Sequence, residues 1–323
     1  MKRIIAVLAA LLFGQAAQAQ DKIAFGLDWL AEAEYGGYYQ ALATGIYKKH
    51  GLDVTIRQGG PQVNHMQLLM AGALDFNLGG GRAIEFAAEG LPYMAVAAIF
   101  QKEPAVLIAH PNTNADSFAA LKGRPIAIGA DTRNGWWRFL AAKYGYTDAM
   151  IRPYTFNLAP FLASKDLVQQ GYLGSEPFLI EKEAKFKPQV LLLSDAGYAG
   201  YANIITTSAK MVNEKPELVQ RFIDASLEGW YSYLYGDPEP GNKLIREANG
   251  DMPQDMLDYG RAVMKTNGIV DSGDTEKLGI GAMTDARWQA FYQSMVAVGV
   301  YKAGIDLSKA YTTKFVNKRV GKP

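Results

Sequence analysis

The sequence predicts an α/β protein built as two lobes, and three observations support this fold class. Short apolar or β-branched runs alternate with helical segments over residues 22–109, and the alternation begins again at residue 117. Such alternation is typical of sheets with helices on both faces. From residue 212 onward the chain reads as mostly helical. About 300 residues, 49% hydrophobic in composition, are long for one core and suit two domains.

The first unit is expected to begin with a strand over residues 22–27, followed by the loop D-W-L-A-E-A-E-Y-G-G at 28–37. A helix is expected over 38–50, because Gly51 is placed to cap it. The remaining elements follow from β-branched runs and from apolar residues at helical spacing. In order they are a strand at 52–56, a turn at 59–61, a helix at 63–71, a strand at 74–78, a glycine break at 79–81, a helix at 83–89, and strands at 94–100 and 105–109.

The second unit repeats the pattern before the chain returns to the first. We expect a short helix at 117–122, a strand at 125–129, helices at 135–144 and 161–171, and short strands at 172–175 and 189–193. Ile204 and Ile205 mark a strand that could rejoin the first unit. Helices then follow at 215–235, opened by Pro216, and at 255–266 and 286–298.

This order predicts a discontinuous first lobe, residues 20–109 and 205–323, and a second lobe, residues 110–204. The chain is expected to cross between them near 109–112 and again near 201–207. Two crossings form a hinge, and the cleft between two hinged lobes is the natural place for a ligand.

The N-terminal segment resembles a cleaved export signal. Lys2 and Arg3 precede an apolar run at 4–13, and A-Q-A at 17–19 is the small-x-small pattern of a cleavage site. We therefore expect residues 1–19 to be removed and the protein to be periplasmic. A membrane anchor is the alternative, but the run is about half the roughly 20 residues that span a bilayer.

Composition excludes several classes of function. The formal net charge is +1 with both signs interspersed, so no basic stripe indicates nucleic-acid binding. The chain has no cysteine, which excludes disulfides, thiolate metal sites, cysteine nucleophiles and a lipid-bearing N-terminal cysteine. Its three histidines, His50, His65 and His110, are scattered and support neither a zinc site nor a catalytic triad.

Several segments carry a resemblance to one family. They are L-D-W at 27–29, E-Y-G-G-Y-Y at 34–39, G-I-Y-K-K-H-G-L-D-V at 45–54, G-A-L-D-F at 72–76, S-E-P-F at 175–178 and G-Y-x-x-Y at 197–201. Together they resemble the type II periplasmic solute-binding proteins of the thiamine-pyrimidine-precursor branch. Nitrate-, sulfonate- and taurine-binding proteins are related to that branch. The resemblance implies a type II two-lobed fold with two hinge crossings.

The resemblance also implies a function without catalysis or cofactor. Such proteins capture a small nutrient, close around it as a population shift, and deliver it to an inner-membrane ABC permease with a cytosolic ATPase. We expect a monomer with a small-molecule ligand and no nucleic-acid partner.

Candidate ligand residues in lobe one follow predicted strand ends, where ligands of open α/β sheets lie. Trp29 could stack on a flat heterocycle or could be buried in the lobe core. Asp28 and Glu32 flank it, and Tyr35 is the candidate aromatic at the following helix start.

Three further candidates in lobe one have plain structural alternatives. Gly80 and Gly81 could bring backbone N–H groups to a ligand or form a simple turn. Arg82 could pair with an anion or be a solvated charge. Asn64 and His65 open a helix, and His65 could contact a ligand or be a plain helix-start or surface histidine. In the related pyrimidine synthases a lysine and a histidine hold a pyridoxal cofactor. Here there is one nearby histidine and no cysteine-rich iron segment, which argues against the synthase.

In lobe two, Asp131 and Thr132 could read a polar ligand edge or cap a helix. Trp136 is favoured over Trp137 as an aromatic wall, since neighbouring helical residues point in different directions. Glu176 is the main candidate, because a carboxylate can accept two hydrogen bonds from an aminopyrimidine edge. Its alternative is a salt bridge to a lysine of lobe one.

Tyr198 and Tyr201 lie at the return crossing, where one could cover the ligand and the other pack in the hinge. The expected function is capture of a small planar nitrogen heterocycle, such as a hydroxymethyl- or formylamino-pyrimidine precursor of thiamine. The alternatives are a binding protein for a sulfonate or nitrate anion, and a secreted enzyme similar to the pyrimidine synthases. No G-x-S-x-G or H-E-x-x-H motif supports a hydrolase.

Overall fold

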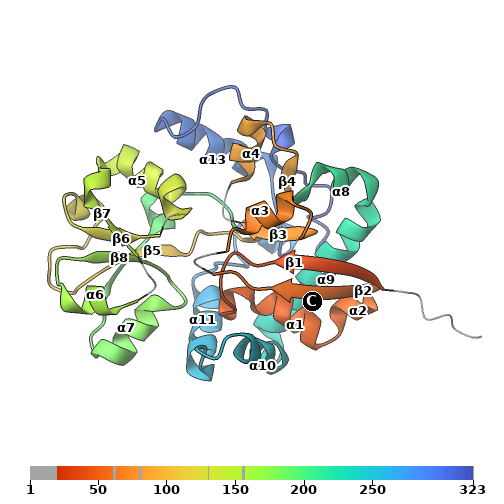
Figure 1. The fold of residues 1–323 in the computed structure, drawn as a ribbon, viewed down its shortest axis with the longest axis horizontal. Coiled ribbons are helices and arrows are strands. Elements are labelled where there is room, and N and C mark those ends of the chain that lie inside the picture. The colour runs from red at the N-terminus through yellow and green to blue at the C-terminus, as the bar shows by residue number, and fades with distance from the viewer. Residues whose placement is uncertain (1–19, 61–62, 80–81, 130, 155–156, 323) are drawn as a thin grey trace, which may run out of the picture.

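A computed structural model describes residues 20–60, 63–79, 82–129, 131–154 and 157–322, and contains two five-stranded sheets (Figure 1). The predicted signal peptide, residues 1–19, lies outside the described part. The first sheet consists of β2 (Leu52–Arg57), β1 (Asp21–Gly26), β3 (Phe76–Gly79), β10 (Ala202–Ser208) and β4 (Tyr93–Phe100), in that order across the sheet. The second consists of β7 (Ile151–Pro153), β6 (Ile126–Ile128), β8 (Val168–Tyr172), β5 (Ala105–Ala109) and β9 (Gln189–Leu192).

Each sheet mixes parallel and antiparallel strands in a way that follows from the chain path. In the first sheet β1 pairs in parallel with β2 and β3, and β10 runs antiparallel between β3 and β4. Ile204 of β10 is the partner of Gly79 on one side and Ala98 on the other. The chain therefore leaves lobe one after β4 and returns to it in β10. This confirms the expected α/β class with a discontinuous first lobe.

One strand lies on the other side of the expected lobe boundary. Residues 105–109 were expected in lobe one, but β5 pairs with β8 and β9 of the second sheet. The first crossing therefore falls between Phe100 and Ala105, earlier than expected. Every residue of β5 is buried, so the strand forms the interior of a sheet rather than an edge.

The helices pack around both sheets, with α5, α6 and α7 on the second and the others around the first (Figure 1). Their bounds are α1 (Gly36–Ala43), α2 (Ile46–Lys49), α3 (His65–Met70), α4 (Ala83–Glu89), α5 (Trp136–Tyr144), α6 (Ala159–Ala163), α7 (Glu176–Ala184), α8 (Ala209–Glu214), α9 (Pro216–Tyr235), α10 (Glu239–Ala248), α11 (Gln254–Thr266), α12 (Asp274–Leu278) and α13 (Asp285–Ala297). Within the described ranges, none of these helices is long and apolar enough to cross a membrane.

Three local expectations were wrong, and some elements were missed. The helix expected over 38–50 divides into α1 and α2, because Gly45 adopts a left-handed φ of 72°. The segment 161–171 contains the end of α6 and most of strand β8, not one helix. The strand expected at 172–175 is the end of β8 and the turn before α7. Strand β7 and helices α7 and α10 were not anticipated.

Aromatic side chains fill the core of lobe one between the first sheet and α9. Phe222 of α9 stacks on Phe76 at a centroid distance of 4.1 Å and meets the edge of Phe25 at 5.2 Å. Tyr38 of α1 contacts Phe25 at 4.9 Å and Trp230 at 5.6 Å. Because these rings are fully buried, they hold the first sheet, α1 and α9 together as one rigid body.

Glycines allow α1 and α9 to approach closely. Added Cβ atoms would lie 2.1 Å from the Tyr233 ring at Gly36 and 2.3 Å from the Trp230 ring at Gly37. On the opposing helix, a Cβ on Gly229 would lie 2.3 Å from the carbonyl oxygen of Gly37. The glycine pair in E-Y-G-G-Y-Y therefore serves helix packing.

Replacing Gly229 by alanine should destabilise the protein by about 1–3 kcal/mol, the usual effect of overpacking a filled contact. The added methyl would lie 2.3 Å from the Gly37 carbonyl oxygen and 2.6 Å from the Ala41 Cβ. The cost of these close contacts outweighs the better helix propensity of alanine. Urea unfolding provides the measurement. Gly250→Ala is the matched control, because nothing lies within 4 Å of its added Cβ. Equal unfolding midpoints for the two variants would contradict the packing argument.

Candidate functional site

Acidic and phenolic side chains gather where strand ends of the two sheets meet. From lobe one, the segment after β1 contributes Asp28, Glu32 and Glu34, and the crossing after β4 contributes Glu103. From lobe two, Glu176 begins α7 directly after β8. We call these five residues the carboxyl cluster. Its members act on one another, since the charges of Glu34, Glu176 and Asp28 all raise the pKa of Glu32.

Three carboxyls of the cluster are buried, and burial raises the pKa of each. Glu32, Glu34 and Glu103 are 8%, 3% and 7% exposed. Burial is the main cause of a pKa raised well above the ordinary value at Glu32, and of pKa values of about 7 at Glu34 and Glu103. The Glu176 charge adds to the rise at Glu34 and the Asp28 charge to that at Glu103. An ionised carboxylate at these positions lacks the water that normally stabilises it.

Tyrosine hydroxyls lie beside carboxyls on both sides of the cluster. Tyr35 donates to Asp28 Oδ1 at 2.9 Å within lobe one, and Tyr154 donates to Glu176 Oε1 at 3.0 Å within lobe two. The charge of Glu103 acts on Tyr172, the last residue of β8. Burial, followed by neighbouring acidic charges, raises the pKa of all three phenols, so they are neutral donors.

Glu176 is oriented by its own lobe. Its Oε2 accepts hydrogen bonds from the Tyr172 backbone N at 2.7 Å and from Ser175 Oγ at 2.5 Å. Its place in the first turn of α7 is also favourable, because helix N-termini attract negative charge. Since Oε1 accepts only the Tyr154 bond among the described contacts, one lone pair on that oxygen can accept another donor. The lysine salt bridge considered from the sequence is not among the described contacts of Glu176.

Glu34 touches lobe two directly. An added Cβ on Gly174 would lie 2.2 Å from Glu34 Oε1 and 3.3 Å from the Cα of Gly260 in α11. The Oε1 atom is buried and has no hydrogen-bond partner among the described residues. Only the absence of side chains at Gly174 and Gly260 lets the two lobes meet around this carboxyl.

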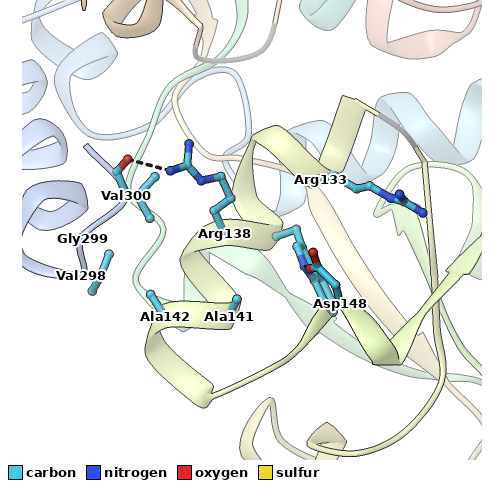
Figure 2. Close-up of a pocket in the computed structure, with 9 residues that line it drawn as sticks. Arg133, Arg138, Ala141, Ala142, Asp148, Val298, Gly299 and Val300 are labelled. Carbon is cyan, nitrogen blue, oxygen red and sulfur yellow. Dashed lines mark hydrogen bonds between the residues drawn. The ribbon is translucent and has the colours of Figure 1, made fainter. Parts of the chain in front are cut away.

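A separate cavity of about 530 Å³ lies between α5 and residues 298–300 (Figure 2). Arg133, Arg138 and Asp148 line it, and Arg138 donates to the Val300 carbonyl at 3.2 Å. Figure 2 shows Arg138 pointing to the C-terminal segment and Arg133 pointing away from it. No member of the carboxyl cluster lines this cavity, so the two features are distinct.

Comparison with known proteins identifies the family. The family model described as "NMT1/THI5 like" matches residues 32–240. The chain belongs to the NMT1/THI5-like family. A curated relative, the riboflavin-binding protein RibY of Chloroflexus aurantiacus, is 24% identical over 305 residues, covering 92% of this chain and 86% of the relative. The resemblance seen in the sequence is thus confirmed at the level of the family.

Solved structures show the same fold. The aliphatic sulphonate-binding protein SsuA of Escherichia coli matches with a TM-score of 0.65 at 14% identity, covering 90% of this chain and 91% of that one. The alkanesulfonate-binding SsuA of Xanthomonas axonopodis pv. citri, bound to MOPS, matches at 0.64 and 14%, covering 92% and 99%. The nitrate-binding protein NrtA of Synechocystis PCC 6803 matches at 0.61 and 14%, covering 92% and 87%. This NMT1/THI5-like protein therefore has the periplasmic-binding-protein fold.

The structure brings together four of the predicted site residues: Asp28, Glu32, Tyr35 and Glu176. Trp29 adjoins them, half-buried against the core, with its carbonyl accepting from Gly59 N at 2.7 Å. Whether any of these residues contacts a solute stays a prediction.

Other predicted residues have local partners instead. Asn64 caps α3 by accepting from Gln67 N at 3.0 Å, and the exposed Arg82 pairs with Glu85 at 2.8 Å. Thr132 donates to Gln170 Oε1 at 2.8 Å, and Trp136 packs half-buried against the core. Gly80 and Gly81 lie outside the described residues, as does the side chain of Asp131.

Both tyrosines of the return crossing are buried by packing. Tyr198 meets Phe139 and Phe291 edge-on at 5.4 and 5.2 Å. Tyr201 lies 4.2 Å beneath the Arg287 guanidinium and accepts a hydrogen bond from the backbone N of residue 284 at 3.1 Å. These contacts are all within the protein, and a ligand-covering role for either tyrosine remains a prediction.

The sequence analysis missed four members of this region: Glu34, Glu103, Tyr154 and Tyr172. Glu34 stands in the same loop as Glu32, and Glu103 follows the strand expected at 94–100, so strand-end reasoning could have found both. Tyr154 and Tyr172 follow or end β7 and β8, the two strands that were not recognised.

Replacing Gly174 by alanine should separate the lobes, because its methyl would occupy the space of the Glu34 carboxyl. We expect a larger radius of gyration in small-angle X-ray scattering and an unchanged far-ultraviolet circular dichroism spectrum. Gly250→Ala again serves as control, and a radius identical to the control would show that this contact does not limit closure.

Proposed function

We propose that this protein is the solute-capturing component of an ABC importer, working in the periplasm as a monomer that delivers its solute to a membrane permease. We further propose that the solute is a small planar nitrogen heterocycle carrying N–H groups, with a thiamine pyrimidine precursor as the leading candidate. The observation that supports this ligand class is the carboxyl cluster between the lobes. The family membership and the shared fold support the transport role.

The free acceptor positions of the cluster suit a ligand that donates hydrogen bonds. Glu176 Oε1 can accept one more bond, and Glu34 Oε1 has no partner among the described residues. An amino or ring N–H group would satisfy such oxygens, and buried acceptors left unsatisfied cost about 1–3 kcal/mol each. The half-buried Trp29 beside Asp28 offers an aromatic face for a flat ring.

A riboflavin-like solute fits the same chemistry. RibY is named a riboflavin-binding protein, and riboflavin is itself a planar nitrogen heterocycle with a ring N–H. Flavins therefore belong in the same test as aminopyrimidines.

An anionic solute is the weaker candidate. Sulfonate- and nitrate-binding proteins share the fold, but the side-chain charges acting on Glu32 here come from three carboxylates. An anion placed among them would be repelled, and anion sites prefer cationic or N–H donors. Arg82, the cation proposed from the sequence, is exposed and paired with Glu85.

An enzyme is the third candidate, since the desulfurization enzyme DSZB shares the fold with a TM-score of 0.54. In the ranges the structure describes, no group of three histidine, cysteine or acidic residues could hold a metal ion. Pyridoxal absorbance in the purified protein would revive the synthase alternative.

Calorimetric titration with hydroxymethylaminopyrimidine, riboflavin, taurine and nitrate tests the ligand class. We expect binding of one heterocycle and none of either anion. Binding of taurine or nitrate with no response to the heterocycles would remove the assignment.

The variant Glu176→Gln should weaken binding of the heterocycle by about 1–3 kcal/mol, the scale of a hydrogen bond to a charged group. The Glu228→Gln variant is the control, because Glu228 lies on α9 and pairs with His50 outside the cluster. Dissociation constants from the same calorimetry provide the comparison. An unchanged affinity in Glu176→Gln would remove this carboxylate from the site.

A further inference from the structure

The contact around Glu34 joins three segments that belong to both lobes. Glu34 is only 3% exposed, its Oε1 lies against Gly174 of lobe two, and its Oε2 would lie 3.9 Å from a Cβ added to Gly260 of α11. Nearby, α7 and α11 also pair through Lys182 and Asp255 at 2.7 Å and through the tilted rings of Phe178 and Tyr259 at 4.9 Å. The burial of Glu34 therefore depends on the lobes being in contact.

Among the residues that the structure describes, the groups that face Glu34 include no compensating cation. From its own loop and from lobe two come Glu32, Glu176 and Tyr172, and from α9 comes Tyr233. Helix α11 brings Asp258 and Arg261 near Tyr233, but Arg261 donates to the carbonyls of Tyr233 and Leu234, each at 2.7 Å. Lys182 is paired with Asp255. An ionised Glu34 would thus be a buried charge among other acids, which is costly.

The protonation state of Glu34 must change when the lobes separate. In the closed arrangement burial raises its pKa from 4.5 to about 7, with the charge of Glu176 adding to the rise and a backbone hydrogen bond opposing it. Separation would admit water and move Glu176 away, so the pKa would return toward its ordinary value. At a pH between these two pKa values, the closed form therefore carries a proton on Glu34 that the open form has lost.

We propose that Glu34 is a proton-controlled latch: lobe two closes over it when its carboxyl is neutral and is pushed away when it is ionised. At neutral pH an empty protein would then be biased toward the open form. A solute that donates an N–H group to Glu34 could replace the proton, so that closure follows capture. This inference rests on the two-lobed capture function proposed above.

The sign and size of the effect follow from linkage. Because the closed form binds one more proton, raising the pH disfavours closure. The closing equilibrium constant should fall by up to about tenfold per pH unit between the two pKa values and level off above the higher one.

The distance between the lobes can be followed without any solute. The chain has no cysteine, so Lys187→Cys in lobe two and Lys243→Cys on α10 provide a unique pair of labelling sites, both exposed. Fluorescence energy transfer between dyes at these sites would be measured from pH 5 to pH 8.5. We expect the transfer efficiency to fall as the pH rises and to become flat above about pH 8.

Two variants of the labelled protein identify the group responsible. Glu34→Gln should stay closed and lose the response to pH. Glu103→Gln should keep it, because Glu103 also has a pKa of about 7 but accepts from the Ala105 backbone N within the crossing, at 3.1 Å. If Glu34→Gln does not fold, Gly174→Ala replaces it. This variant keeps the Glu34 carboxyl, but the added methyl occupies the space beside Gly174 into which that carboxyl packs. The lobes of this variant should therefore stay apart at every pH.

Three results would overturn the latch: a lobe distance independent of pH in the parent protein, a response that survives in Glu34→Gln, or one that is lost in Glu103→Gln. Because no solute is present, these outcomes leave the ligand assignment untouched. Failure of the calorimetric titrations would likewise leave the latch standing.

Discussion

Burial of carboxyl groups against one another is the interaction on which this structure depends. Glu32, Glu34 and Glu103 are nearly covered, and Glu176 acts on Glu32 and Glu34 from the other lobe. Ions removed from water lose several kcal/mol of hydration, which only hydrogen bonds, counter-charges or protonation can offset. In the described part of the chain, tyrosine hydroxyls, backbone N–H groups and the raised pKa values of the buried carboxyls meet only part of this demand. What remains is a demand for donors at the junction of two movable lobes.

The fold creates that demand by placing strand ends opposite each other. The chain leaves the first sheet after β4 and re-enters it in β10, so lobe two stands between two crossings. Each lobe is stiffened by its own packing, the first by rings around Phe222 and by the glycine contacts of α1 with α9. Rigid lobes with flexible crossings concentrate any motion at their junction. Closure therefore changes the burial of the acidic side chains at that junction directly.

The sequence predicted the fold class and part of the site for clear physical reasons. Strand-end reasoning located Asp28, Glu32 and Tyr35, because β1 is an apolar strand followed by polar residues. Glu176 was placed near the cleft although its surroundings were misread: it begins a helix that was not expected.

The errors also have physical causes. The polar run Q-Q-G in β8 hides a strand, since Gln169 is buried and Gly171 is packed against Ile108. Strand β7 spans only three residues, too few for a periodic pattern. Without these two strands, Tyr154 and Tyr172 could not be placed. The lobe contact at Gly174 was equally hidden, because no local pattern shows which glycine meets a residue 140 positions earlier.

The same fold can serve opposite charges, so the ligand class must come from the side chains at the junction. Sulphonate- and nitrate-binding proteins share this architecture at 14% identity, and a shared fold does not by itself fix the ligand. In this chain those groups are carboxyls and phenols, with Arg82 turned to Glu85 on the surface. Repulsion among the carboxylates disfavours the closed state when it is empty. Repulsion between the carboxylates and a bound anion disfavours the closed state when it holds an anion. A neutral or cationic donor relieves it, so the acids that make closure costly also select the solute that permits it.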